Sequence, residues 1–265
     1  MARKTYDMIL SLGGSCAAAS QLKWRGLRQT SCPFDWLYCI SPETLDRLAE
    51  CFEKDFKEWP KREHLILMEG EEKRPNAAPF QYRDRITGFR FIHDCRLPLT
   101  DDQAYATFAE KYSRRIGRLL DCLVKADSVC LLFDSNFSGC EQGLRSLRDV
   151  LLRKSGPKKK IDVVWVEFES ERFGVEGDES FMRLRFVHPK TDYVYKGKSF
   201  EFAFLDDIQL SGKIALPAGH GSRFQCARTP YGLRVDLFRN VHHLFQMEVS
   251  VLGRRFALFV GSPRQ

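Results

Sequence analysis

Cys16 stands where a predicted strand passes into a predicted helix. Residues 6–12 are apolar enough for a buried strand, and Gly13 and Gly14 suit a tight turn. Ser15 is a good N-cap for a helix that begins at Cys16. The unpaired N–H groups and the dipole at a helix N-terminus favour the thiolate form of a cysteine placed there. Because thiolates attack carbonyl carbons, this placement predicts a nucleophile, against the alternative of a buried structural thiol.

The cysteine pattern indicates a reducing compartment. The chain has nine cysteines, an odd number, and none of them form a C-x-x-C pair. This excludes a zinc ribbon and a thioredoxin-type redox motif, and it argues against a disulfide framework. The N-terminus lacks the features of a signal peptide, and no stretch is long and apolar enough to span a bilayer. We therefore expect a cytoplasmic protein with no cofactor, no metal site and no membrane partner.

Length and composition are those of a globular protein. The 265 residues are 43% hydrophobic and 12% aromatic, and the formal net charge is +7. The densest basic run, at residues 154–160, contains a glycine and a proline and is typical of a solvated loop. No RNA-binding or zinc-finger motif accompanies it, so a nucleic-acid partner is not expected.

The middle of the chain alternates strands with capped helices. A capping box at residues 100–103 opens a long amphipathic helix, and the apolar strand 129–133 then ends at Asp134. A second capping box at 138–141 opens another helix, which is followed by the strand 161–168. This order predicts an α/β or α+β fold, with helices packed on a mixed sheet.

The composition changes after about Gly174. We expect a division into a core of residues 1–173 and a β-rich C-terminal portion, 174–265, packed on it. The strand-like segments of that portion are 182–188, 193–195, 200–204, 232–238 and 245–260. Within the core, alternation along the predicted strand 89–93 places Phe89, Phe91 and His93 on one face.

Three blocks near the N-terminus resemble a known family. They are L-G-x-x-C ending at Cys16, a helix ending in G-L-R, and P-F-D-W at residues 33–36, and a further match is G-F-x-F followed by His93. Together they resemble a bacterial family of unknown function described as papain-like cysteine peptidases. The resemblance covers roughly the first 170 residues.

The resemblance implies a papain-like core and a cysteine hydrolase or acyl-transferase acting on a peptide, another amide or an ester. It implies Cys16 as nucleophile and His93 as base, an order along the chain that papain-like folds use. A third residue should orient the imidazole. Asp134, at the end of a neighbouring predicted strand, is our first candidate, and Asp35 is the other.

The residues around Cys16 have alternative roles. Asp35 and Trp36 either line the substrate site or lock a turn, with the Asp35 carboxylate bonded to backbone amides. No glutamine stands shortly before Cys16 to supply an oxyanion-hole amide. Backbone N–H groups of Cys16 and of the Gly13–Gly14 turn would have to serve, with Ser11 or Ser15.

Two other functions compete with the thiol hydrolase. One is a serine-dependent esterase in which the same turn presents Ser11 or Ser15. The other is a non-catalytic module that binds an anionic partner through a basic surface. The residues of that surface would be Arg83, Arg85, Arg90, Lys154 and Lys158–Lys160.

Overall fold

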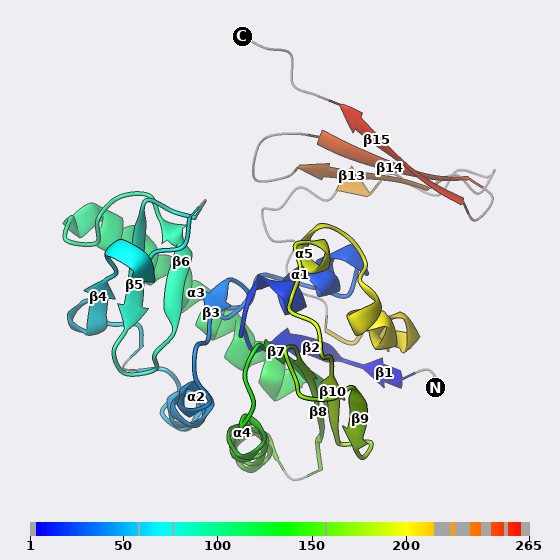
Figure 1. Ribbon diagram of the computed structural model, residues 1–265, viewed down its shortest axis with the longest axis horizontal. Helices are drawn as coiled ribbons and strands as arrows, with labels where there is room; N and C mark the ends of the chain where they lie inside the picture. The colour runs from blue at the N-terminus through cyan, green and yellow to red at the C-terminus, as the bar shows by residue number, and fades with distance from the viewer. Residues whose placement is uncertain are drawn as a thin grey trace. The chain divides into compact units, whose positions relative to one another are not determined.

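The computed structural model describes residues 4–57, 59–75, 77–156 and 158–214 and, beyond them, the backbone of four strands within 224–260. The chain divides into two compact units, Met1–Ala215 and Leu216–Gln265. The first unit holds every candidate site residue and combines helices with parallel and antiparallel sheets (Figure 1). This confirms the predicted mixed α/β class.

A five-stranded sheet forms the centre of the first unit. Its order is β2-β7-β8-β10-β9, and all neighbours are parallel except β9, which is antiparallel to β10. Almost every residue of β7 and β8 is buried, as expected for parallel strands covered on both faces. The strands are β2 (Met8–Ser11), β7 (Ser128–Ser135), β8 (Lys160–Glu167), β9 (Gly174–Gly177) and β10 (Phe181–Arg185), and a short parallel pair joins β1 (Lys4–Tyr6) to β11 (Ile208–Leu210).

The first unit has four longer helices among its described residues. They are α1 (Cys16–Trp24), α2 (Glu43–Glu53), α3 (Asp102–Lys125) and α4 (Glu141–Ser155). The long helix is capped one residue later than its capping box suggests, because the side chain of Asp101 accepts from the N–H of Ala104 at 2.7 Å. The start of α4 has no side-chain cap, so the cap expected from Ser138 is not observed. As predicted, α4 connects the parallel strands β7 and β8.

A second, antiparallel sheet carries His93. Its order is β3-β6-β5-β4, and its strands are β3 (Leu37–Tyr38), β4 (Leu65–Leu67), β5 (Phe80–Asp84) and β6 (Arg90–Cys95). The ladder between β5 and β6 is irregular between the pairs of Phe80 and Tyr82. As expected, Phe89 and Phe91 share the buried face, since both rings pack on Trp59, but His93 is exposed and does not join them. Phe91 packs on Tyr112 of α3, with ring centroids 5.2 Å apart, whereas His93 lies beside Cys16.

Two segments expected to be strands are helical. They are α5 (Tyr193–Lys196) and the 3₁₀ helix η3 (Phe200–Asp207). Alternating aromatic residues favour a strand locally, but a strand forms only where a neighbour pairs with it. Here the backbone is bound by α1 instead, since Nε2 of Gln21 donates to the carbonyls of Val194 and Gly197 at 2.5 and 2.6 Å.

The division between the units comes later than the boundary expected at residues 173 and 174. Strand β10 pairs with β8, and β11 pairs with β1, so the chain up to Ala215 completes the first unit. In the second unit the described strands form an antiparallel sheet in chain order. They are β12 (Phe224–Gln225), β13 (Arg234–Arg239), β14 (Phe245–Val251) and β15 (Arg254–Val260).

Candidate functional site

The turn before Cys16 is pressed against the end of β7. Gly13 and Gly14 have φ angles of +82° and +91°, a region that favours glycine. A Cβ atom on Gly14 would lie 1.8 Å from the carbonyl oxygen of Asp134. The carbonyl of Gly14 accepts from the N–H of Cys39 at 3.2 Å. These contacts fix where α1 begins, at the carboxyl edge of the parallel sheet, where α/β folds commonly hold their sites.

Ser15 and Asp134 hold the first turn of α1. The Ser15 hydroxyl accepts from the N–H of Ala17 at 3.1 Å and donates to Asp134 at 2.6 Å. The other carboxylate oxygen of Asp134 accepts from the N–H of Ala18 at 3.2 Å. The N–H of Cys16 has no acceptor among the described residues, as expected at the first helical position. It is therefore a free donor next to the sulfur.

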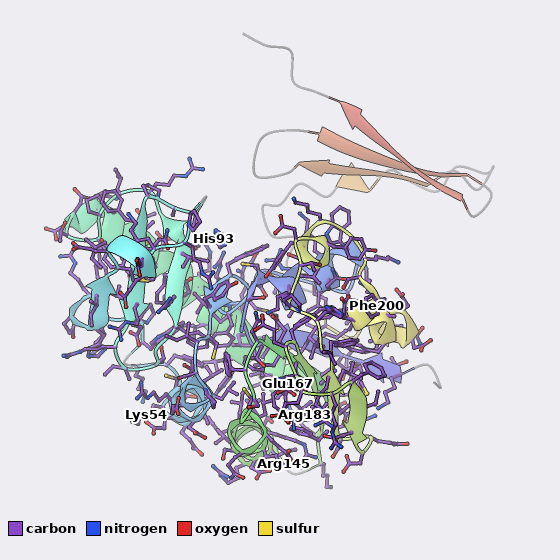
Figure 2. The ribbon with its side chains drawn as sticks, in the orientation of Figure 1. Lys54, His93, Arg145, Glu167, Arg183 and Phe200 are labelled. Atoms are coloured by element: carbon purple, nitrogen blue, oxygen red, sulfur yellow. The ribbon has the colours of Figure 1, made fainter. Side chains whose placement is uncertain are left out.

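Cys16 and His93 are in contact. The Sγ atom of Cys16 lies 3.3 Å from Nε2 of His93, although 77 positions separate the two residues. Figure 2 labels His93 on β6, on the side nearest α1 in this view. The ring of Trp36 meets the imidazole edge to face, with centroids 6.4 Å apart and planes at 86°. Cys16 is 9% exposed and His93 is exposed, so solvent reaches the pair from the imidazole side.

The surroundings favour a neutral pair. The pKa of the Cys16 thiol is raised from 9.0 to about 12, first by burial and then by the negative charge of Asp134, and Lys190 opposes the rise. Burial also lowers the pKa of His93 below its ordinary 6.5, against the effect of Asp94. At neutral pH both groups are uncharged. Both pKa shifts oppose the thiolate expected at the helix N-terminus.

Asp134 does not contact the imidazole of His93. Its fully buried carboxylate binds Ser15, the N–H of Ala18 and the ammonium group of Lys190. Asp134 therefore caps α1 and does not orient the imidazole as expected, because the end of β7, on which Asp134 lies, meets α1. Among the described residues, no carboxylate is hydrogen-bonded to the second ring nitrogen of His93.

The P-F-D-W block joins the site to the core. The Asp35 carboxylate accepts from Nε of Arg28 at 2.9 Å and from the N–H of Cys32 at 2.9 Å. Arg28 is the arginine of the G-L-R block, so the two blocks of the sequence pattern are joined by a buried ion pair. Phe34 is fully buried and stacks on Phe89. Asp35 therefore locks the turn that presents Trp36 to His93.

Two residues of the site were missed from the sequence. Lys190 donates to both Asp134 and Ser15, and its side chain is only 5% exposed. Tyr195 interacts with Ser15 and with Tyr38 of β3. Lys190 follows a proline in a polar turn, and Tyr195 lies in a segment expected to be a strand. No signal in the sequence connects either of them to Cys16.

The serine alternative receives no geometric support. The Ser11 hydroxyl is buried and accepts from the N–H of Gly13 at 3.4 Å. The Ser15 hydroxyl is occupied by the cap, by Asp134 and by Lys190. Within the described part of the chain, neither hydroxyl contacts a histidine.

The basic residues expected to form an anion-binding surface are not gathered on one face. Lys154 pairs with Asp55 at 2.6 Å, and Lys159 donates to carbonyls at the end of α3. Both lie near α4 and the start of β8, well apart from β5 and β6 in Figure 1. Arg83 and Arg90, in contrast, are register partners on β5 and β6.

The described residues hold neither a metal cluster nor a membrane span. Eight cysteines there are buried free thiols, and Cys226 lies outside the described residues. No group of three or more potential metal ligands occurs within residues 4–214 as described. In the same part of the chain, no helix has the length and hydrophobicity required to cross a membrane.

Comparisons with known proteins agree with the motif resemblance. Residues 7–153 match the family described as "Putative papain-like cysteine peptidase (DUF1796)". An uncharacterized protein of Acanthamoeba polyphaga mimivirus is 27% identical over 124 residues, which are 42% of this chain and 54% of the viral protein. The chain thus matches about half the length of that relative. No solved structure matches significantly.

Proposed function

The chain belongs to the DUF1796 family, and on that basis we propose that it is a papain-like cysteine hydrolase or acyl-transferase that acts on an amide, peptide or ester bond. The observation that carries the proposal is the 3.3 Å contact between the Cys16 sulfur and Nε2 of His93. The likeness to papain is chemical: a thiol at a helix N-terminus and an imidazole on a strand are brought together. Cys16 is the nucleophile and His93 the general base and acid.

The first half of the reaction forms a thioester. Nε2 of His93 removes the Sγ proton as the sulfur attacks the acyl carbon, and the N–H of Cys16 donates to the oxyanion that develops. This requires the imidazole tautomer with hydrogen on Nδ1. When the tetrahedral intermediate collapses, the bond to the leaving group breaks. The leaving amine or alcohol takes the proton from Nε2.

The second half releases the acyl group. A water molecule, or an acceptor amine or alcohol, gives its proton to Nε2 and attacks the thioester carbon. The C–S bond breaks, the thiol regains a proton from the imidazolium, and the acid or the transferred acyl product leaves. Hydrolysis and transfer thus use the same residues and differ only in the acceptor.

The neutral resting pair supports general-base catalysis rather than attack by a preformed thiolate. A proton moves only when the acyl carbon is in place, so the thiol is protected from oxidation between turnovers. Trp36 limits the rotation of the imidazole in the absence of a carboxylate behind it. The buried free thiols favour a reducing compartment, and on that ground we propose a cytoplasmic location.

Acylation by p-nitrophenyl acetate tests this function. We expect a burst of one nitrophenolate per chain, with one acetyl group on Cys16 by mass spectrometry. Cys16→Ala should abolish the burst, and His93→Ala should slow it by about 10²- to 10⁴-fold, the usual value of a general base.

Cys51 provides the matched control. It has the same 9% exposure as Cys16, and burial likewise raises the pKa of its thiol to about 12, with no histidine contact among the described residues. Cys51→Ala should leave the burst unchanged. Acetylation of Cys51 as fast as that of Cys16, or a full burst in Cys16→Ala, would contradict the proposal.

A further inference from the structure

Two arginines lie opposite each other on β5 and β6 without an acidic partner. Arg83 and Arg90 are register partners in the antiparallel ladder, and both are partly buried. Neither side chain makes a hydrogen bond or an ion pair with any residue that the structure describes, and the Nε atom of each is buried without an acceptor. Like charges directly opposite each other destabilise a sheet, and buried donors without acceptors cost free energy. A bound anion would relieve both effects.

A third arginine is held beside this pair. The side-chain amide of Gln81 accepts from the N–H of Arg74 at 2.9 Å and donates to its carbonyl at 2.8 Å. The guanidinium of Arg74 lies 4.8 Å from the ring centroid of Tyr38, and Tyr38 is the register partner of Arg90 on β3. We call Arg74, Arg83 and Arg90 the arginine cluster.

Electrostatics agree with this placement. Burial lowers the pKa of Arg90 most; the negative charge of Glu72 opposes this, and the positive charges of Arg74 and Arg83 add smaller decreases. Glu72 is exposed and makes no ion pair with Arg90 among the described residues. The three guanidinium groups therefore lie in one region, and no carboxylate of the described residues forms an ion pair with Arg83 or Arg90 there.

The cluster lies on the open face of its sheet. The adjacent row of cross-strand partners, which includes Phe91 and Tyr82, is directed to α3, since Phe91 packs on Tyr112. Adjacent rows of a sheet point to opposite faces, so the row of Tyr38, Arg90 and Arg83 points away from α3. Ile66, the next residue of this row on β4, is 42% exposed.

Tyr38 connects the cluster to the site at Cys16. Its ring lies beneath Arg74, and its side chain interacts with Tyr195, which in turn interacts with Ser15 at the N-cap of α1. The next residue, Cys39, donates its N–H to the carbonyl of Gly14. A single extended substrate would therefore reach from the arginine cluster to the Cys16 sulfur.

We propose that the arginine cluster binds an anionic oxygen group, a carboxylate or a phosphate, on the compound that Cys16 attacks. Guanidinium groups form forked hydrogen bonds with both kinds of anion. The inference rests on the proposed function for the reaction, although binding of the anion itself does not require turnover. Such a site would select acyl compounds that carry a negative charge some distance from the bond that is broken.

Direct binding tests the cluster without catalysis. The full chain with Cys16→Ala is titrated calorimetrically with inorganic phosphate and with succinate. Adding Arg83→Gln or Arg90→Gln should weaken binding about tenfold or more, the usual effect of losing a charge-assisted hydrogen bond. Arg85→Gln is the matched control, because it removes the same charge from an exposed residue just after β5. Equal weakening by all three variants would overturn the proposal.

The stability of the variants separates binding from a structural role. Removing one of two unpaired like charges should leave the melting temperature of Arg90→Gln unchanged or raise it. Phosphate should raise the melting temperature of the unsubstituted chain and not that of Arg90→Gln. A strongly destabilised Arg90→Gln would show that the arginines serve the fold, and would overturn the proposal.

Acylation connects the cluster to the reaction. p-Nitrophenyl esters with a terminal carboxylate, phosphate or neutral amide, on chains of increasing length, are compared in the burst assay. The charged esters should acylate Cys16 at least tenfold faster at one chain length, and the comparison between them identifies the anion. Arg90→Gln should remove this preference, whereas Arg85→Gln, outside the cluster, should keep it. Anion binding without acylation of Cys16 would contradict the proposed hydrolase function and leave the anion site standing. Acylation with no preference for charged esters would contradict the proposal that the arginine cluster binds the substrate of Cys16.

Discussion

At the scale of single residues, two opposing effects act on the Cys16 sulfur. The helix N-terminus favours the thiolate by about 0.3–1 kcal/mol at ordinary sites. The net rise of the thiol pKa from 9.0 to about 12, caused first by burial and then by the charge of Asp134, corresponds to ~4 kcal/mol in the other direction. Burial therefore dominates, and His93 has to remove the proton during attack. Lys190 limits the rise of the thiol pKa, because its positive charge offsets the negative charge of Asp134.

The pH dependence of Cys16 alkylation distinguishes a neutral pair from an ion pair. With a thiol pKa of about 12 and a His93 pKa below 6.5, alkylation by iodoacetamide should keep rising with pH above 8.5. The rate assisted by His93 should be lost only below pH 6.5, when the imidazole becomes protonated. Peptide mass spectrometry measures both limbs, with Cys51 as the internal reference. A constant high rate between pH 5 and 8 would instead indicate a stable thiolate–imidazolium pair.

At the scale of elements, the site depends on the junction between β2, β7 and α1. The glycine turn packs on the backbone of Asp134, and the carboxylate of the same residue caps the helix through Ser15 and Ala18. One strand end thus sets both the position and the direction of α1. The irregular ladder between β5 and β6 then allows His93 to reach the sulfur while Phe91 stays in the aromatic core.

Substitution of Gly14 tests this junction. Gly14→Ala places a Cβ atom 1.8 Å from the carbonyl oxygen of Asp134, in addition to the strain of a positive φ. Gly26→Ala is the control, because Gly26 has a φ of +70° and no atom within 4 Å of the position that a Cβ would occupy. The control should lower the free energy of unfolding by about 1–2 kcal/mol, and Gly14→Ala by at least about 3 kcal/mol more. Equal losses in urea denaturation would disprove the close approach.

At the scale of the molecule, the site extends beyond the segment that matches the family. The match ends at residue 153, but Lys190 and Tyr195 reach the first turn of α1 from the segment that follows β10. Gln21 and Trp24 of α1 hold that segment through its carbonyls. The residues between the family segment and Ala215 therefore complete the site as well as the sheet.

Truncation tests where the catalytic unit ends. A chain that ends at Ala215 keeps β10, β11 and the contacts of Gln21, so it should unfold cooperatively and retain the acylation burst. A chain that ends at Phe173 loses β10, one of the two strands that pair with β8, and uncovers the buried core beside α1. It should be insoluble or lack near-ultraviolet circular dichroism. A folded, active chain ending at Phe173 would restore the boundary at residues 173 and 174.

Short-range preferences in the sequence were enough to predict the local features. The turn at Gly13 and Gly14, the cap at Ser15 and the start of α1 at Cys16 follow from such preferences, and so do the β7-α4-β8 unit and the long helix α3. The family blocks also selected Cys16 and His93 as a pair. The predictions of the turn, the cap and the helices were confirmed because each depends on a few residues that are neighbours in the sequence.

The environment of the pair, in contrast, was established only when the chain folded. Its neutral charge state, the capping role of Asp134 and the approach of Lys190 and Tyr195 all depend on contacts between residues far apart in the sequence. The helix at 193–196 and the N-cap of the helix at 200–207 are bound by Gln21 of α1, through Val194 and Ser199, where the local pattern favoured strands. Burial and long-range hydrogen bonds arise only when the chain is packed, so no spacing in the sequence could reveal them.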